Sequence, residues 1–224
     1  REKRNAALAR FDRVRNGVVW IADGLFTLVG RDEIVERLRL AEARFSAEDF
    51  YRSPTLCVID AVYSINARYG SVRNVVARYC GMFGLERFRE DPTVLPSRKD
   101  QDRISHLLHR YEERGIEGMA QAVFCNRQRT STRNGILKAE AVLRFAESLR
   151  AVGLESLQDV PRVAADPEVE KSILDIPGQR SGISLRYFWM LCGATERIKP
   201  DRMILRFLRQ AIGRDVVLDE AEPL

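Results

Sequence analysis

One stretch of this chain, Ser172–Phe207, constrains the fold more than any other. We expect a short helix that ends at Leu174, a tight turn over residues 175–179, and a second helix over 181–192. After a loop, the Lys-Pro-Asp sequence at 199–201 opens a third helix. The whole stretch is therefore predicted to be helical apart from its turn and loop.

The residues of the turn indicate what it can bind. Pro177 and Gly178 supply backbone geometry that other residues adopt poorly, and Ser181 is a candidate cap for the second helix. Backbone N–H groups at such a turn, followed by a helix N-terminus, form an anion site without any charged side chain. The sequence therefore predicts an anion-binding turn.

Helical spacing of apolar residues extends through the rest of the chain, and no segment shows the sustained alternation of a strand. The helix that begins at Ser53-Pro54 and continues to about Ala67 is apolar nearly all round, which predicts a central, buried position. We therefore predict an all-α fold, with further helices over 2–15, 31–44, 72–80, 102–113, 116–124, 135–152 and 156–164, and one that begins near 166.

The chain has 224 residues and a formal charge of +5, and only five of its 37 basic residues are lysines. Arginine suits bidentate contacts with phosphate, although a GC-rich genome would also raise its content. The four cysteines are dispersed without a CxxC pair, which favours a reducing, cytoplasmic compartment and argues against zinc. No apolar run approaches the length of a membrane span, so we expect no membrane association.

Three motifs in this chain resemble the HhH-GPD superfamily of DNA glycosylases, the relatives of endonuclease III. The family's Leu-Pro-Gly hairpin is matched by Ile176-Pro177-Gly178, and its Asp-x-x-(apolar)-x-Arg-(apolar) helix by Asp201–Phe207, where Asp201 follows Gly178 by 23 residues. Two other segments match in the same order upstream: Tyr63-Ser64-Ile65-Asn66 with Ser71-Val72-Arg73-Asn74, and Lys138-Ala139-Glu140.

The resemblance implies a fold of two helical lobes with the helix-hairpin-helix at the edge of the cleft between them. In this chain the first lobe would span 54–192 and end in the helix-hairpin-helix at 167–192. The second lobe would combine 1–53 with 193–224.

The resemblance also implies a catalytic residue. Asp201 matches the family's catalytic Asp, which stabilises an oxocarbenium-like sugar and orients a water as the base departs; the alternative is an Asp that caps a helix. Bifunctional members carry a Lys just after the hairpin, but no Lys lies between Lys171 and Lys199. We therefore expect a monofunctional enzyme, in which Lys199 contacts a phosphate or remains a solvated surface charge.

Other roles implied by the resemblance each have a structural alternative. Asp60 is a candidate general acid, or a buried Asp bonded to a helix end. Asn66 would fill the gap left by a flipped base, or simply end a helix. Residues of the hairpin would hold DNA phosphate through their main-chain groups. A polar loop would bind the phosphate backbone of the opposite DNA strand, or be solvated. The base pocket candidates are aromatic residues that could equally form the core. The hairpin residues are Gly178, Gln179, Arg180, Ser181 and Gly182, the loop residues Arg129 and Arg133, and the pocket residues Tyr51, Tyr63 and Trp189.

The leading hypothesis is a monomeric, monofunctional DNA glycosylase that acts on double-stranded DNA, in base-excision repair or in bacterial defence against phage DNA with hypermodified bases. It would need no cofactor, because the Cys quartet that holds an iron–sulfur cluster in many family members is absent after Cys192, and no metal. The alternative is a DNA-binding module of the same fold without catalysis. A third hypothesis is an unrelated helical interaction protein.

Overall fold

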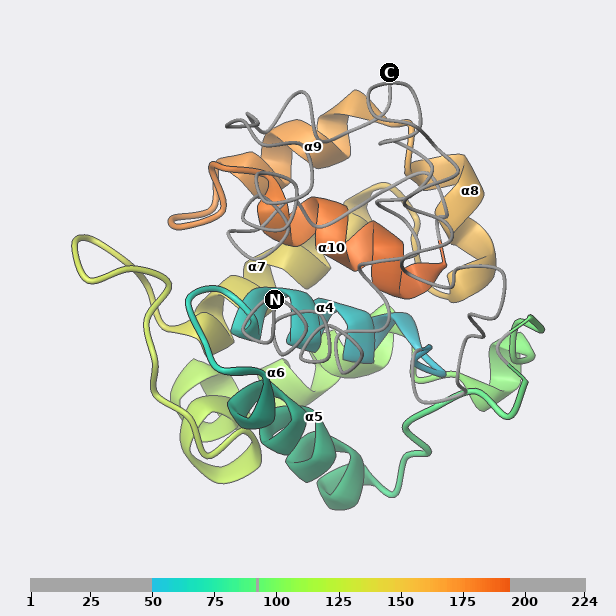
Figure 1. Cartoon of the computed structure of the whole chain (residues 1–224), viewed down its shortest axis with the longest axis horizontal. Helices are drawn as coiled ribbons and strands as arrows, with labels where there is room; N and C mark the ends of the chain where they lie inside the picture. Colours follow the sequence, from blue (N-terminus) through green and yellow to red (C-terminus); the bar gives the residue numbers. More distant parts are fainter. Residues whose placement is uncertain (1–49, 92, 194–224) are drawn as a thin grey trace, which may run out of the picture. The chain divides into compact units, whose positions relative to one another are not determined.

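A computed structural model of the chain describes residues 50–91 and 93–193 (Figure 1). They lie within one of the two compact units into which the chain divides, Ala47–Ala194. Over these residues the structure has seven α-helices and no β-strand, which confirms the all-α prediction. The predicted 54–192 lobe falls within this unit, whereas nearly all of the second predicted lobe, with the helices at 2–15 and 31–44, lies outside the described residues.

The helices are 4 to 15 residues long, and the connection between the second and third of them spans residues 84–103. In chain order they are α4 (Pro54–Tyr63), α5 (Tyr69–Phe83), α6 (Ile104–Gly118), α7 (Lys138–Ala151), α8 (Val160–Val163), α9 (Pro167–Leu174) and α10 (Ile183–Cys192). A π turn over Met119–Val123 follows α6, and 3₁₀ turns cover Arg98–Asp100 and Leu157–Asp159.

Helix α4 is the centre of the unit. All ten of its residues are buried, and it packs against α5, α7 and α10. In Figure 1 it lies between α10 on one side and α5 and α6 on the other. Its sequence explains this place: Pro54 fits the first turn of a helix, and apolar residues follow on every face. The predicted central position is confirmed.

The predicted helix ends on either side of residues 64–68 differ from the structure. Helix α4 ends at Tyr63 and not near Ala67, because Asn66 adopts left-handed backbone with φ of 49°. Helix α5 begins at Tyr69, with Arg68 before it, and not at residue 72 as predicted. Residues 64–68 are left as a short connection between the two helices.

A buried carboxylate joins three of these helices. Asp102 Oδ2 accepts hydrogen bonds from Thr55 Oγ1 of α4 at 2.9 Å, Tyr79 OH of α5 at 2.8 Å and Arg110 of α6 at 2.7 Å. Three donors, one of them charged, compensate the carboxylate for its loss of hydration. This interaction fixes the packing around the N-terminal end of α4.

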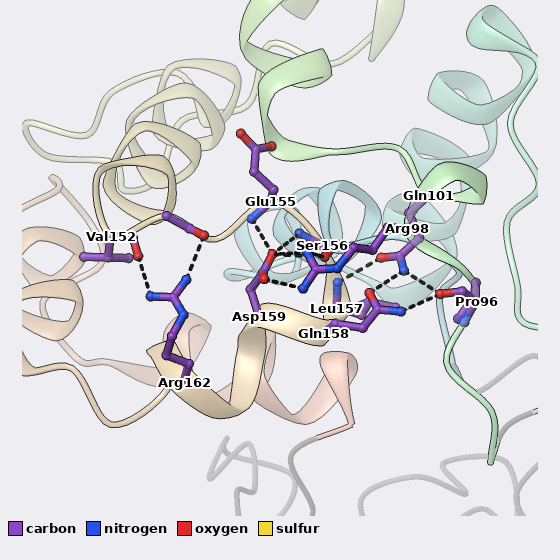
Figure 2. A network of polar contacts seen from close by, with 11 residues as sticks. Pro96, Arg98, Gln101, Val152, Glu155, Ser156, Leu157, Gln158, Asp159 and Arg162 are labelled. Carbon is purple, nitrogen blue, oxygen red and sulfur yellow. Dashed lines mark hydrogen bonds and ion pairs between the residues drawn. The ribbon is translucent and has the colours of Figure 1, made fainter.

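A second polar network ties the connection after α7 to residues 96–101 (Figure 2). Asp159 accepts hydrogen bonds from the N–H groups of Glu155 and Ser156 at 3.0 and 2.8 Å, and from Arg98 at 2.8 Å. Burial raises the pKa of Asp159, but the hydrogen bonds from Arg98 and the two N–H groups outweigh it and hold the pKa below its usual value.

None of the helices within the described residues is both long enough and apolar enough to span a membrane.

Candidate nucleic-acid interface

The connection between α9 and α10 consists of two consecutive tight turns over residues 175–182. The N–H of Gln179 donates to the carbonyl of Ile176, and the N–H of Gly182 donates to the carbonyl of Gln179, both at 2.9 Å. Gly178 and Gly182 have φ of 91° and 69°, in the left-handed region that favours glycine. Gly182 and not Ser181 directly precedes α10, and none of the described side chains caps this helix, so the predicted cap at Ser181 is wrong.

Side chains in this turn point in opposite directions. Arg180 and Ser181 are exposed, and neither N–H group has a backbone acceptor among the described residues. Gln179 is only 1% exposed, and its Oε1 accepts a hydrogen bond from Ser184 Oγ in the first turn of α10. The Gln179 side chain therefore supports the turn from inside, while Arg180 and Ser181 remain available to a ligand.

A second exposed segment, the arginine loop of residues 126–137, is closed like a small hairpin. The N–H of Lys138 donates to the carbonyl of Gln128 at 2.8 Å, and the N–H of Thr130 donates to Ile136 at 2.9 Å. Gly135 is essential to the bend, since a Cβ there would lie 2.4 Å from the backbone nitrogen of Ser131.

The arginines of this loop are exposed and differ in how firmly they are held. Arg129 donates from Nε to the carbonyl of Gly135 at 2.8 Å, which orients its guanidinium. Arg127 pairs with Glu117 at 2.5 Å. Arg133 is exposed near the tip of the loop.

The arginine loop and the α9–α10 turn touch each other. A Cβ placed on Gly178 would lie 2.4 Å from Cβ of Thr130 and 2.6 Å from its Oγ1, so the Gly178 backbone rests directly on the Thr130 side chain. Only glycine permits this approach. Two segments predicted separately to contact DNA thus form one surface.

The third segment, residues 64–68, links α4 to α5 and carries Asn66, which is exposed. It is joined to the arginine loop by the buried side chain of Lys138. Nζ of Lys138 donates to the carbonyls of Tyr63 and Ile65 at 2.9 and 2.6 Å, and to Gln128 Oε1 at 3.2 Å. All three segments therefore meet at one end of the unit, on the left in Figure 1.

Asp60 lies in the core of α4 and is 1% exposed. Its carboxylate accepts hydrogen bonds from Tyr51 OH at 2.6 Å and from Ser64 Oγ at 2.7 Å. Burial and the nearby Asp60 carboxylate raise the pKa of Tyr51, so its hydroxyl stays protonated and keeps donating. This arrangement matches the structural alternative for Asp60, and its role as a general acid stays a prediction.

The three aromatic residues expected to line a base pocket are all buried. Tyr51 stacks on Phe88 with ring centroids 5.7 Å apart, and Trp189 packs on Phe188 at 4.7 Å. The rings of Tyr63 and Phe124 have centroids 5.2 Å apart, and the Tyr63 hydroxyl has no hydrogen-bond partner within residues 50–91 and 93–193. A base could reach these rings only after the surrounding side chains move, so the pocket stays a prediction.

The predicted catalytic residue Asp201 and the neighbouring Lys199 lie outside the described residues. Sequence reasoning also missed two residues that build the surface, Thr130 and Lys138. For Lys138 a signal exists: a lysine in the first turn of a helix opposes the helix dipole, which points to a specific partner for its charge. Thr130 carries no comparable signal.

The chain was compared with known proteins. A family model described as a domain of unknown function (DUF8548) matches residues 30–224, which is most of the chain. No curated protein and no solved structure matches it.

Proposed function

We propose that this chain, which belongs to the family described as a domain of unknown function (DUF8548), is a DNA-binding protein that acts as a monofunctional DNA glycosylase. It extrudes a modified or damaged base from duplex DNA and hydrolyses the N-glycosidic bond, leaving an abasic site. Asp201 stabilises the positive charge that develops on the sugar and orients the attacking water.

The observation that carries the DNA-binding part is a concentration of positive charge on three segments that meet. Residues 64–68, 126–137 and 175–182 hold five arginines and a single carboxylate, Asp175. That is a net charge of +4, in a chain whose total is +5. Such a basic surface matches a phosphate backbone, whose charges dominate the affinity of most DNA-binding proteins.

Each segment has a part in this proposal. The N–H groups and side chains of Arg180 and Ser181 hold one phosphate on the α9–α10 turn. Arg129 and Arg133 contact the other strand's backbone. Asn66, exposed on left-handed backbone at the end of α4, fills the gap left by the extruded base.

The absence of a lysine from the α9–α10 turn supports the monofunctional reaction. Forming a Schiff base with the sugar requires an amine beside it, and residues 175–182 contain none. Water is then the nucleophile, and the strand stays intact after the base has left. Repair of damaged bases and removal of hypermodified phage bases are both consistent with this chemistry.

A base-release assay tests the proposal. Duplexes that carry uracil, alkylated, oxidised, mismatched or glucosylated bases are incubated with wild type and with Asp201→Asn, and then treated with alkali. We expect strand cleavage only after alkali and only with wild type. Cleavage without alkali contradicts the monofunctional reaction, and equal cleavage by both proteins contradicts the role of Asp201.

A second candidate function is a DNA-binding module of the same fold that lacks catalysis. The burial of Asp60 and of the aromatic rings of Tyr51, Tyr63 and Trp189 favours it, because these groups form core contacts and no open base pocket. This candidate predicts salt-dependent duplex binding by wild type and Asp201→Asn alike, with no base released from any substrate.

A further inference from the structure

Lys138 occupies the point where two of the three basic segments join. It begins α7, yet it is only 2% exposed. Its Nζ lies against the two carbonyls at the end of α4, of Tyr63 and Ile65, and against the side-chain carbonyl of Gln128 in the arginine loop. Few lysines are buried to this extent unless their charge has partners.

The chemistry of the ammonium group shows what Lys138 does there. A lysine ammonium has three protons, and three acceptors are present, so each proton has a partner. With all of its protons engaged and almost no exposure, the amine is not placed to attack a substrate. Carbonyls at the C-terminal end of a helix carry partial negative charge, which suits a cation. Lys138 is therefore a cap for α4 that reaches across from α7.

The same three contacts connect two parts of the proposed DNA surface. Ile65, whose carbonyl Lys138 binds at 2.6 Å, directly precedes Asn66. Gln128 directly precedes Arg129, and its backbone carbonyl also accepts the N–H of Lys138 at 2.8 Å. One residue thus holds the backbone next to Asn66 and the backbone next to Arg129.

We infer that Lys138 is a positioning residue, which fixes the spacing between Asn66 and the arginine loop so that both contact one DNA duplex. The inference rests on the proposed function, because it assumes that both segments bind DNA. Contacts on a duplex are set by the fixed geometry of its backbone, so two protein segments that shift relative to each other cannot engage it together.

The first experiment compares Lys138→Met with Lys171→Met, an equal change of charge at an exposed position. Hydrogen exchange of the free proteins is followed together with duplex affinity, measured by fluorescence anisotropy. In Lys138→Met we expect faster exchange over 64–68 and 128–136, unchanged exchange in α5 and α6, and a loss of affinity of about tenfold. Lys171→Met should match the wild type in exchange.

A milder variant covers the case in which Lys138→Met does not fold. Gln128→Ala removes the side-chain contact of Lys138 Nζ to the loop, and leaves in place both carbonyl contacts of Nζ and the backbone hydrogen bond from the Lys138 N–H to residue 128. We expect a severalfold loss of affinity with unchanged thermal stability. Because Gln128 would act through Lys138, the Lys138→Met/Gln128→Ala double variant should lose much less binding free energy than the two single variants together.

The outcomes separate the inference from the proposed function. If the wild type binds duplex DNA and Lys138→Met binds it equally well, the positioning role is overturned while the proposed function stands. Fully additive losses for Lys138→Met and Gln128→Ala also overturn it. If the wild type binds no duplex DNA, the proposed function itself fails, and the role of Lys138 in DNA binding fails with it.

Discussion

Replacing Gly178 with alanine tests the contact that joins the α9–α10 turn to the arginine loop. The new Cβ would lie 2.4 Å from Cβ of Thr130, well inside van der Waals contact, and the backbone at φ of 91° disfavours any side chain. The left-handed conformation costs roughly 1–2 kcal/mol. Overpacking against Thr130 costs about 1–3 kcal/mol. We therefore expect Gly178→Ala to lower the free energy of unfolding by about 3 kcal/mol.

A matched control separates the two costs. Gly84 also has left-handed backbone, with φ of 62°, but a Cβ there would meet nothing within 4 Å. Gly84→Ala should lose only the conformational part, so the two variants should differ by about 2 kcal/mol. Urea unfolding followed by circular dichroism at 222 nm measures both values.

A second-site change sharpens the test. Thr130→Gly removes the clashing Cβ and should restore part of the stability of Gly178→Ala, whereas Thr130→Ala keeps that Cβ and should restore little. Equal losses for Gly178→Ala and Gly84→Ala, or equal rescue by glycine and alanine at position 130, would refute the reasoning that the turn rests on Thr130.

Further predictions concern buried polar groups. Tyr51→Phe removes one of the two side-chain donors to Asp60 that lie within the described residues, and should cost about 1–3 kcal/mol in urea unfolding, a loss that shrinks in an Asp60→Asn background. The pKa of Asp159 is held below its usual value in the folded protein, so its contribution is present at neutral pH and is lost as the pH falls below about 4; Asp159→Asn should destabilise the protein at pH 7 more than at pH 3. Burial lowers the pKa of Lys138 to about 8 from 10.5. Between these values the unfolded chain binds more protons, so this group should make stability rise with pH, and Lys138→Met should abolish that rise in thermal melts between pH 7.5 and 10.

The local structure of this unit follows from its sequence in large part. The apolar run of α4 predicted its burial, because a helix that is apolar on every face is stable only when it is surrounded by other parts of the protein. The end of α4 was harder to predict. Asn66 adopts left-handed backbone there, and the residues that precede it do not indicate this conformation. Ser181 looked like a helix cap, but the preceding turns place Gly182 directly before α10.

Contacts between distant segments were not predictable. Gln179 was expected to bind phosphate through its backbone, and nothing in the sequence indicated that its polar side chain would be buried and accept a hydrogen bond from Ser184. The approach of Gly178 to Thr130 and the reach of Lys138 across to α4 depend on how the helices pack. The spacing of apolar residues predicts which face of a helix is buried, but it does not predict which other segment packs against that face.

Duplex binding as a function of salt tests the central claim, that the three joined segments form a nucleic-acid surface. The measurement compares wild type with Arg129→Gln/Arg133→Gln and with Lys99→Gln/Arg103→Gln. The second pair removes the same charge from exposed positions in a segment on the opposite side of the unit in Figure 1.

We expect a steep fall of log K with log salt for the wild type and for the Lys99/Arg103 variant. The slope should be shallower by about 2 for the Arg129/Arg133 variant, because each lost phosphate contact removes about 0.9. Equal slopes for the two double variants, or binding that does not change with salt, would contradict a nucleic-acid surface at this end of the unit.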